Sequence, residues 1–193
     1  GSPGQPPQPA PKPASPTAKP AAPAAKPTPR PQGGNARTPA GKGAELTSFG
    51  LYFEELRPKL TDTWYMFTPL DLSNDSVLSY PLVANNQSIV GSVRVTVRAG
   101  QLFIECLPVE GVNLGREFYT LFPNLDAIQT LNVNLLEAQG YRFNEPIDIQ
   151  QTFGSDRKVI LYVNNTADYK ANLRGVTAFV PEQHRLFMQN LMQ

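Results

Sequence analysis

Residues 89–107 read IVGSVRVTVRAGQLFIECL, and apolar side chains alternate with polar ones on both sides of Ala99-Gly100. This alternation is typical of two strands that each bury one face. A two-residue turn at Ala99-Gly100 would join the strands directly. The stretch therefore predicts an antiparallel hairpin.

The turn also sets the register of the predicted hairpin. Three apolar pairs then share one face: Val97 with Leu102, Val95 with Ile104, and Val93 with Cys106. On the other face Arg94 lies opposite Glu105, which forms a cross-strand pair of opposite charges. Because one register satisfies both faces, we expect it in the folded chain. Cys106 then faces the core, where it acts as a small hydrophobic residue.

Further strands are predicted at shorter apolar segments bounded by Asn, Asp, Ser and Gly. They are residues 63–68, 77–83, 147–150, 158–163 and 176–180. The run at 159–163 is continuously apolar, as in a central strand that is buried on both faces. Pro81 places the segment 77–83 at a sheet edge or at a break in a strand.

Helical signals occur at three places in the chain. The first is a series of apolar residues at helical spacing: Leu46, Phe49, Phe53, Leu56 and Leu60. Pro58 should end this first helix early. The second signal is at residues 124–128, which fit one helical turn. The third is Pro181, which opens a C-terminal helix. Many short strands with two or three short helices predict a mainly β fold, an antiparallel sandwich-like domain, with α+β as the alternative.

The composition divides the chain into two parts. Residues 1–44 hold 13 of the 20 prolines and six basic residues, with no acidic and no aromatic residue. With so little apolar mass this part is predicted to be a disordered Pro/Ala/Lys-rich linker. Residues 45–193 hold all 18 aromatic residues, 11 basic and 16 acidic residues, and a net charge of −5. They predict a single globular β-rich domain.

Three roles are open to the Pro-rich linker, and a spacer fits its composition best. The segments 13–16 and 20–23 match a bare PxxP pattern, but neither carries the flanking cation of a docking ligand. The basic residues are sparse and have no aromatic residues between them. A nucleic-acid-binding arm, as in a coat protein, is therefore the less favoured alternative.

The counts of reactive residues argue against most enzyme chemistries. The chain has one Cys and one His, which form no internal disulfide and cannot fill a structural zinc shell. We expect His184 to be a solvated helix residue, and we find no nucleophile elbow and no phosphate-binding loop. Residues 71–76 begin like a calcium loop but lack its glycine, so a turn is favoured. The sequence predicts no catalytic residue, no metal site and no cofactor.

Aromatic residues supply the remaining candidate site. Trp64, Tyr65, Tyr119 and Phe122 could form a sugar-stacking platform or a surface for a partner protein. Aromatic residues inside strands also commonly form the core of a β domain. A core role is therefore the alternative to a surface role for these four residues.

A resemblance to a group of known proteins implies a cellular location for this chain. Residues 64–75, with Tyr80-Pro81-Leu82-Val83 and Val90-Gly91-Ser92-Val93, resemble uncharacterised extracytoplasmic proteins of Gram-positive gut bacteria that carry a Pro/Ala/Lys-rich stalk before a β domain. The resemblance implies a secreted or cell-surface protein, with any signal or anchor outside this sequence. It assigns no activity and no site residue.

Together these observations predict a non-catalytic extracytoplasmic domain that binds or scaffolds an extracellular protein or glycan. A carbohydrate-binding module is the first alternative, and a nucleic-acid-associated protein is the second. The sequence leaves the partner and the oligomeric state open.

Overall fold

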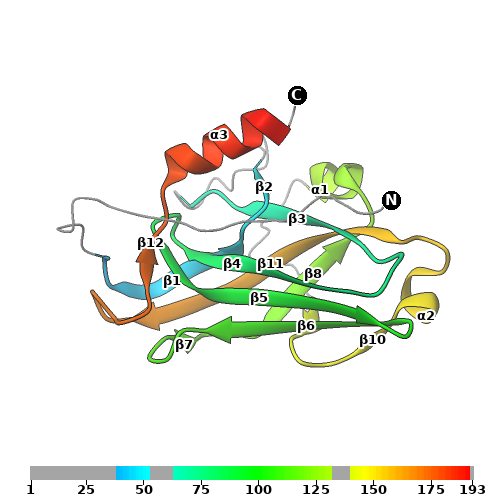
Figure 1. Cartoon of the computed structure of the whole chain (residues 1–193), viewed down its shortest axis with the longest axis horizontal. Helices are drawn as coiled ribbons and strands as arrows, with labels where there is room; N and C mark the ends of the chain where they lie inside the picture. The colour runs from blue at the N-terminus through cyan, green and yellow to red at the C-terminus, as the bar shows by residue number, and fades with distance from the viewer. Residues whose placement is uncertain (1–37, 53–62, 132–139, 192–193) are drawn as a thin grey trace. The chain divides into compact units, whose positions relative to one another are not determined.

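The computed structural model describes residues 38–52, 63–131 and 140–191. The chain divides into two units, Gly1–Arg37 and Thr38–Gln193, and all described residues lie in the second. Its strands and helices are shown in Figure 1. In chain order they are β1 (Gly41–Ser48), β2 (Leu51–Tyr52), β3 (Met66–Asp71), β4 (Ser76–Ala84), β5 (Ser88–Arg98), β6 (Gln101–Pro108), β7 (Asn113–Leu114), β8 (Phe118–Phe122), α1 (Leu125–Leu131), β9 (Tyr141–Arg142), β10 (Ile147–Asp148), α2 (Ile149–Phe153), β11 (Lys158–Tyr169), β12 (Thr177–Ala178) and α3 (Pro181–Leu191).

The predicted hairpin is formed by β5 and β6. Its register pairs Arg98 with Gln101 next to the turn, and every predicted cross-strand pair is present. Ala99 and Gly100 have φ values of 51° and 79°, as a type I′ turn requires at both central positions. The Arg94 guanidinium forms the expected ion pair with the Glu105 carboxylate. The local pattern therefore determined this hairpin in full.

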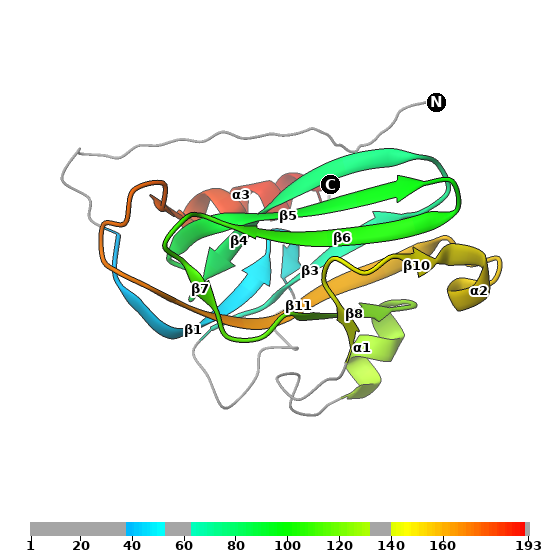
Figure 2. The ribbon, with the colours of Figure 1, turned by 90° about the horizontal axis from the view of Figure 1, so that it is seen from below.

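The strands follow the order β10-β6-β5-β4-β1-β11-β3-β2, and all the pairings found are antiparallel. The long strand β11 links the two layers of the domain. Its first half pairs with β3 and β8, and its second half pairs with β1 and β7. Figure 2 shows the β4-β5-β6 layer beside β11 and β8. A mainly antiparallel β fold with three short helices in the described residues is thus confirmed.

The main core lies between the two layers. Val159, Leu161 and Val163 of β11 pack in this core with the apolar face of the hairpin. Ile160 and Tyr162 point to the opposite face of β11, where they join a second cluster with Ile128 of α1. Residues 159–163 of β11 are therefore buried on both faces, which explains the continuous apolar run there.

The predicted helix that begins at Leu46 is wrong in its first part. Leu46 lies in β1, where it pairs with Asn165 of β11 and Ala84 of β4 and is fully buried. Pairing on both sides outweighs helical spacing, because tertiary contacts override local propensity. Phe53, Pro58 and the other later positions of that series lie outside the described residues.

The folded region also begins earlier than the composition indicates. Residues 41–44 belong to β1, although we assigned them to the linker. Thr38 is fixed as well, because its N–H donates to Asn172 Oδ1 at 3.1 Å and its Oγ1 accepts from the Asn172 N–H at 3.0 Å. The predicted linker up to residue 37 lies outside the described residues.

Candidate functional site

The four aromatic candidates do not form one surface. Tyr119 belongs to the main core, and Tyr65 and Phe122 belong to the second cluster, where all three are buried. Trp64 packs against a third cluster around Met66, Val83 and Phe179. A shared stacking platform is therefore absent from the described surface. The alternative interpretation, that these aromatic residues belong to the core, accounts for their positions.

Trp64 is half-buried and is held by the turn between β4 and β5. The Trp64 N–H donates to Asn86 Oδ1 at 2.9 Å, and Asn86 Nδ2 donates to the Trp64 carbonyl oxygen at 2.8 Å. The indole also lies 5.3 Å from the His184 ring, measured between centroids. These contacts give Trp64 a structural role under α3.

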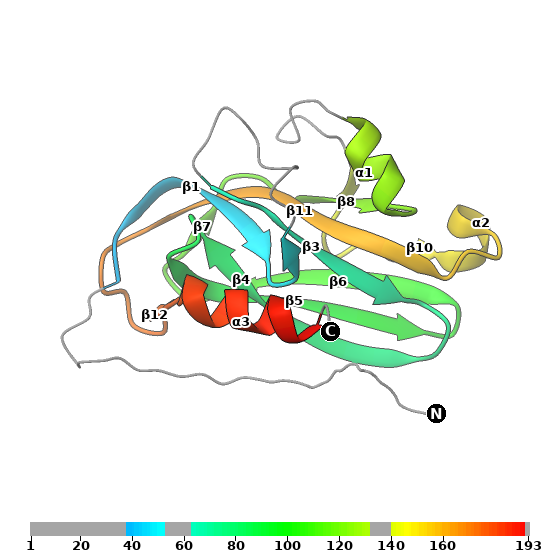
Figure 3. The same ribbon diagram turned by 90° about the horizontal axis from the view of Figure 1, so that it is seen from above.

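His184 is buried rather than solvated, which corrects our expectation. Its side chain is 3% exposed, and its Nε2 lies 2.7 Å from the Gly50 carbonyl oxygen. Figure 3 shows α3 beside β1 and β2, the two strands that flank Gly50. Burial lowers the pKa of His184, and the hydrogen bond to Gly50 opposes this shift. A neutral imidazole packed among aromatic rings is positioned to hold α3 in place.

Cys106 faces the main core, as the hairpin register predicts. Burial, with a smaller contribution from the Glu117 carboxylate, raises the pKa of its thiol to about 12. The thiolate is the reactive form of cysteine, so this side chain is a poor nucleophile at neutral pH.

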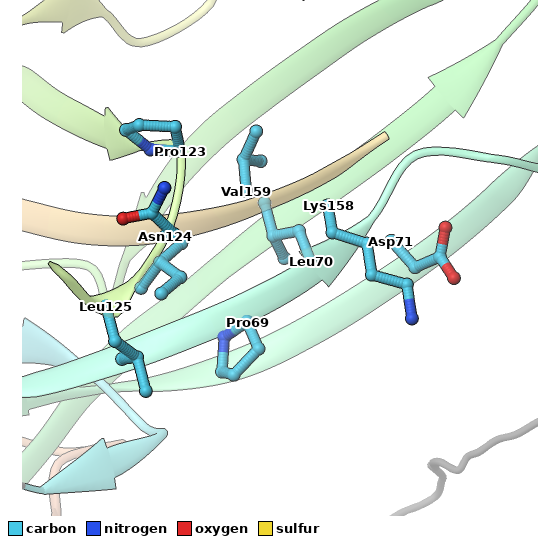
Figure 4. A pocket seen from close by; sticks show the side chains of 9 residues that line it. Pro69, Leu70, Asp71, Pro123, Asn124, Leu125, Lys158 and Val159 are labelled. Atoms are coloured by element: carbon cyan, nitrogen blue, oxygen red, sulfur yellow. The ribbon is translucent and has the colours of Figure 1, made fainter. Parts of the chain in front are cut away.

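A shallow hollow of about 390 Å³ lies where β3, β11 and the β8–α1 junction meet. Figure 4 shows its lining, which includes Pro69, Pro123, Leu125 and Lys158. The register explains this grouping, because Pro69 and Phe122 flank Ile160 on its two sides. The hollow thus lies on the face of β11 that carries the second cluster.

Two polar groups of the hollow have structural partners. Asp71 Oδ1 accepts hydrogen bonds from the Ser73 N–H at 3.0 Å and from Ser73 Oγ at 2.6 Å. These bonds show the turn that we favoured over a calcium loop in residues 71–76. Asn124 Oδ1 accepts from the Ala127 N–H at 2.9 Å and caps the first turn of α1.

Lys158 is the exposed cation of the hollow. It lies opposite Asp71 in the register of β3 and β11, and Figure 4 shows both side chains reaching outward from adjacent strands. Within the described part of the chain no carboxylate lies within 4 Å of its ammonium group. The hollow therefore combines apolar walls with one positive charge, Lys158, and one negative charge, Asp71, whose carboxylate is bound by Ser73.

Sequence reasoning missed this hollow. Pro69 and Pro123 are more than 50 positions apart, and only their common neighbour β11 brings them together. Pro69 follows Thr68, and Pro123 follows Phe122. The sequence indicated that a strand ends at Pro69, but β3 continues through it to Asp71. A second hollow of the same volume lies by the hairpin turn, between Arg98, Phe103 and Pro146.

The described residues contain no group of three or more His, Cys, Asp or Glu side chains placed to hold a metal ion. Their helices are all too short or too polar to cross a membrane. In comparisons with known proteins, no family profile, curated protein or solved structure matches the chain.

Proposed function

We propose that this chain is a non-catalytic binding or scaffolding domain, presented outside the cell on a Pro-rich stalk, and that it binds a protein ligand through the hollow at Pro69, Pro123 and Leu125. The observation that carries this proposal is the apolar character of the rim. Leu125 and both prolines are exposed around this shallow depression. Clusters of exposed apolar side chains commonly mark binding sites for proteins.

The hollow is also well suited to binding because its walls are rigid. Proline has no side-chain rotamers to lose, and the strands beneath it are fixed by pairing with β11. A ligand therefore orders little of this surface when it binds, which lowers the entropic penalty. Lys158 supplies a positive charge at the rim, whereas the Asp71 carboxylate beside it already accepts hydrogen bonds from Ser73. The favoured ligand therefore offers an apolar side chain next to a carboxylate that can pair with Lys158.

A displayed peptide library and a glycan array, probed with the whole chain, test this proposal. We expect peptides with an apolar residue beside Asp or Glu, and binding that is lost in Leu125→Asp and weakened in Lys158→Ala. Leu107→Asp is the matched control, since Leu107 is 38% exposed and Leu125 40%, and it should bind like the wild type.

Equal loss in both leucine variants would contradict a role for the hollow. Glycan binding that depends on Trp64 would instead support the carbohydrate-binding alternative. RNA binding that disappears when residues 1–37 are removed would support the nucleic-acid alternative.

A further inference from the structure

Strand β4 has an open edge in the described structure. Only its last three residues, 82–84, pair with β1, whereas the whole strand pairs with β5. The Pro81 carbonyl is also bound, by Phe49, so residues 76–80 are the open margin of the β4-β5-β6 layer, whose β4 edge is seen in Figure 2. An edge of this kind presents backbone donors and acceptors to any other extended chain.

The direction of each backbone group follows from hydrogen bonds on the two sides of β4. The Pro81 carbonyl oxygen accepts from the Phe49 N–H at 2.8 Å, so the backbone carbonyl of residue 81 points away from β5. Backbone groups alternate along a strand, and Val77 and Ser79 therefore point the same way as Pro81. Among the described residues nothing binds the outward N–H and C=O groups of Val77 and Ser79.

This edge lacks the features that usually prevent pairing. Residues 76–80 read SVLSY and carry no charge. Val77 is 55% exposed and Leu78 is 40% exposed. Proteins normally protect an open edge with lysine, proline or a bulge. Here the first such feature is Pro81, which has no N–H and ends the open ladder at that point.

We infer that the edge of β4 pairs with β4 of a second copy of this chain, in an antiparallel arrangement about a two-fold axis at Leu78. In this register Val77 lies opposite Ser79 of the other copy, and each of the two equivalent pairs exchanges two backbone hydrogen bonds. Leu78 meets its own counterpart, and Asp75 meets Pro81 rather than a like charge. The two copies are thus complementary without any change in β4.

Other symmetric registers are poorer. With the axis at Val77, the two copies of Val77 face each other and exchange two backbone hydrogen bonds. No further pair forms within β4, because the next outward residue, Asp75, precedes the start of the strand. An axis at Ser79 places Val77 opposite Pro81, which has no N–H and whose carbonyl is already bound to Phe49. The axis at Leu78 therefore makes the most bonds. The inference is independent of the proposed ligand site, because that site lies on β3, β8 and β11.

Sedimentation velocity of the whole chain, at protein concentrations from about 1 µM to about 1 mM, tests this pairing. The range is wide because a contact through one pair of strand edges is small, and small interfaces form weak dimers. We expect a monomer–dimer equilibrium in the wild type. Ser79→Pro removes an outward N–H and no bond to β5, so it should raise the dimer dissociation constant at least about tenfold. A chain that stays monomeric at the highest concentration overturns the proposal and leaves the edge to an extended segment of another protein.

A second variant guards against misfolding of Ser79→Pro. Leu78→Lys places two like charges opposite each other and should also abolish the dimer. Leu107→Lys makes the same change at a leucine of similar exposure on β6 and should leave the dimer intact. Equal dimerisation of Leu78→Lys and the wild type overturns the proposed edge.

Amide hydrogen exchange then locates the interface. The Leu78 and Tyr80 amides face β5 and should exchange slowly at every concentration. The Val77 and Ser79 amides should exchange rapidly in the monomer and slowly in the dimer. A dimer in which these two amides remain unprotected contradicts pairing through β4.

Discussion

His184 Nε2 lies 2.7 Å from the Gly50 carbonyl oxygen, and this contact joins α3 to the loop between β1 and β2. Phe49 lies 5.0 Å from the same imidazole, between ring centroids, and Phe179 lies 5.9 Å from it. The Gly50 oxygen is an acceptor, so a neutral ring with its proton on Nε2 satisfies the contact. A charged ring would keep this hydrogen bond, but burial disfavours the charge, so protonation of His184 weakens the packing beneath α3.

We predict that stability falls as pH is lowered from about 6.5, the ordinary pKa of histidine. Burial lowers the pKa of His184 in the folded chain, so the unfolded chain takes up a proton first. The stabilisation is present above pH 6.5 and is lost as pH falls towards the lower folded-state pKa. Urea unfolding at several pH values measures this loss.

His184→Gln is the matched variant, because its amide retains a donor and has no charge to acquire. The carboxylates titrate in both proteins, and the difference between the two pH profiles therefore isolates His184. Parallel profiles between pH 7.5 and pH 5 would contradict the prediction.

The Arg94–Glu105 pair allows a second prediction, on the energy of a cross-strand ion pair. The Arg94 side chain is partly exposed, so solvent screens the interaction. A double-mutant cycle with Arg94→Ala and Glu105→Ala should give a coupling energy of about 0.5–1 kcal/mol that decreases with added salt. The exposed pair Arg185–Glu182 on α3 is the control and should give a smaller coupling. An equal coupling energy in the two pairs would show that placement across two paired strands does not strengthen the Arg94–Glu105 ion pair.

The hairpin of β5 and β6 could be predicted from the sequence because its determinants are local. Alternation sets the buried face, the two-residue turn sets the register, and the Arg94–Glu105 pair agrees with both. The continuous apolar run of β11 likewise indicated a strand buried on both faces. In each case the necessary information lies within about 20 neighbouring residues.

Features that depend on distant partners could not be predicted in this way. Leu46 and Phe49 fit a helix until β4 and β11 are known to flank β1. His184 lies on a polar-looking helix, and its burial depends on Phe49 and Trp64 far earlier in the chain. The hollow around Pro69 and Pro123 arises from strand order, which no local pattern contains.

Asn86 carries the third prediction, because it combines a left-handed backbone with two hydrogen bonds. Its φ is 56°, and its side-chain amide binds both the N–H and the C=O of Trp64. Asn86→Gly tolerates this φ but loses both bonds, so it should reduce the free energy of unfolding by about 2 kcal/mol. Asn86→Ala loses the same bonds and adds backbone strain, which should cost about 1 kcal/mol more. Trp64 is the only tryptophan, and its fluorescence reports unfolding directly.

Asn144→Gly provides the control for Asn86. Asn144 also has a positive φ, 68°, but it is exposed and its side chain binds none of the described residues. Glycine there should change the free energy of unfolding by less than about 0.5 kcal/mol. If both glycine variants were equally stable, the Asn86–Trp64 bonds would contribute nothing, and the turn would be held by its backbone alone. If Asn86→Ala matched Asn86→Gly, the strain at φ 56° would be relieved by a local shift of the turn.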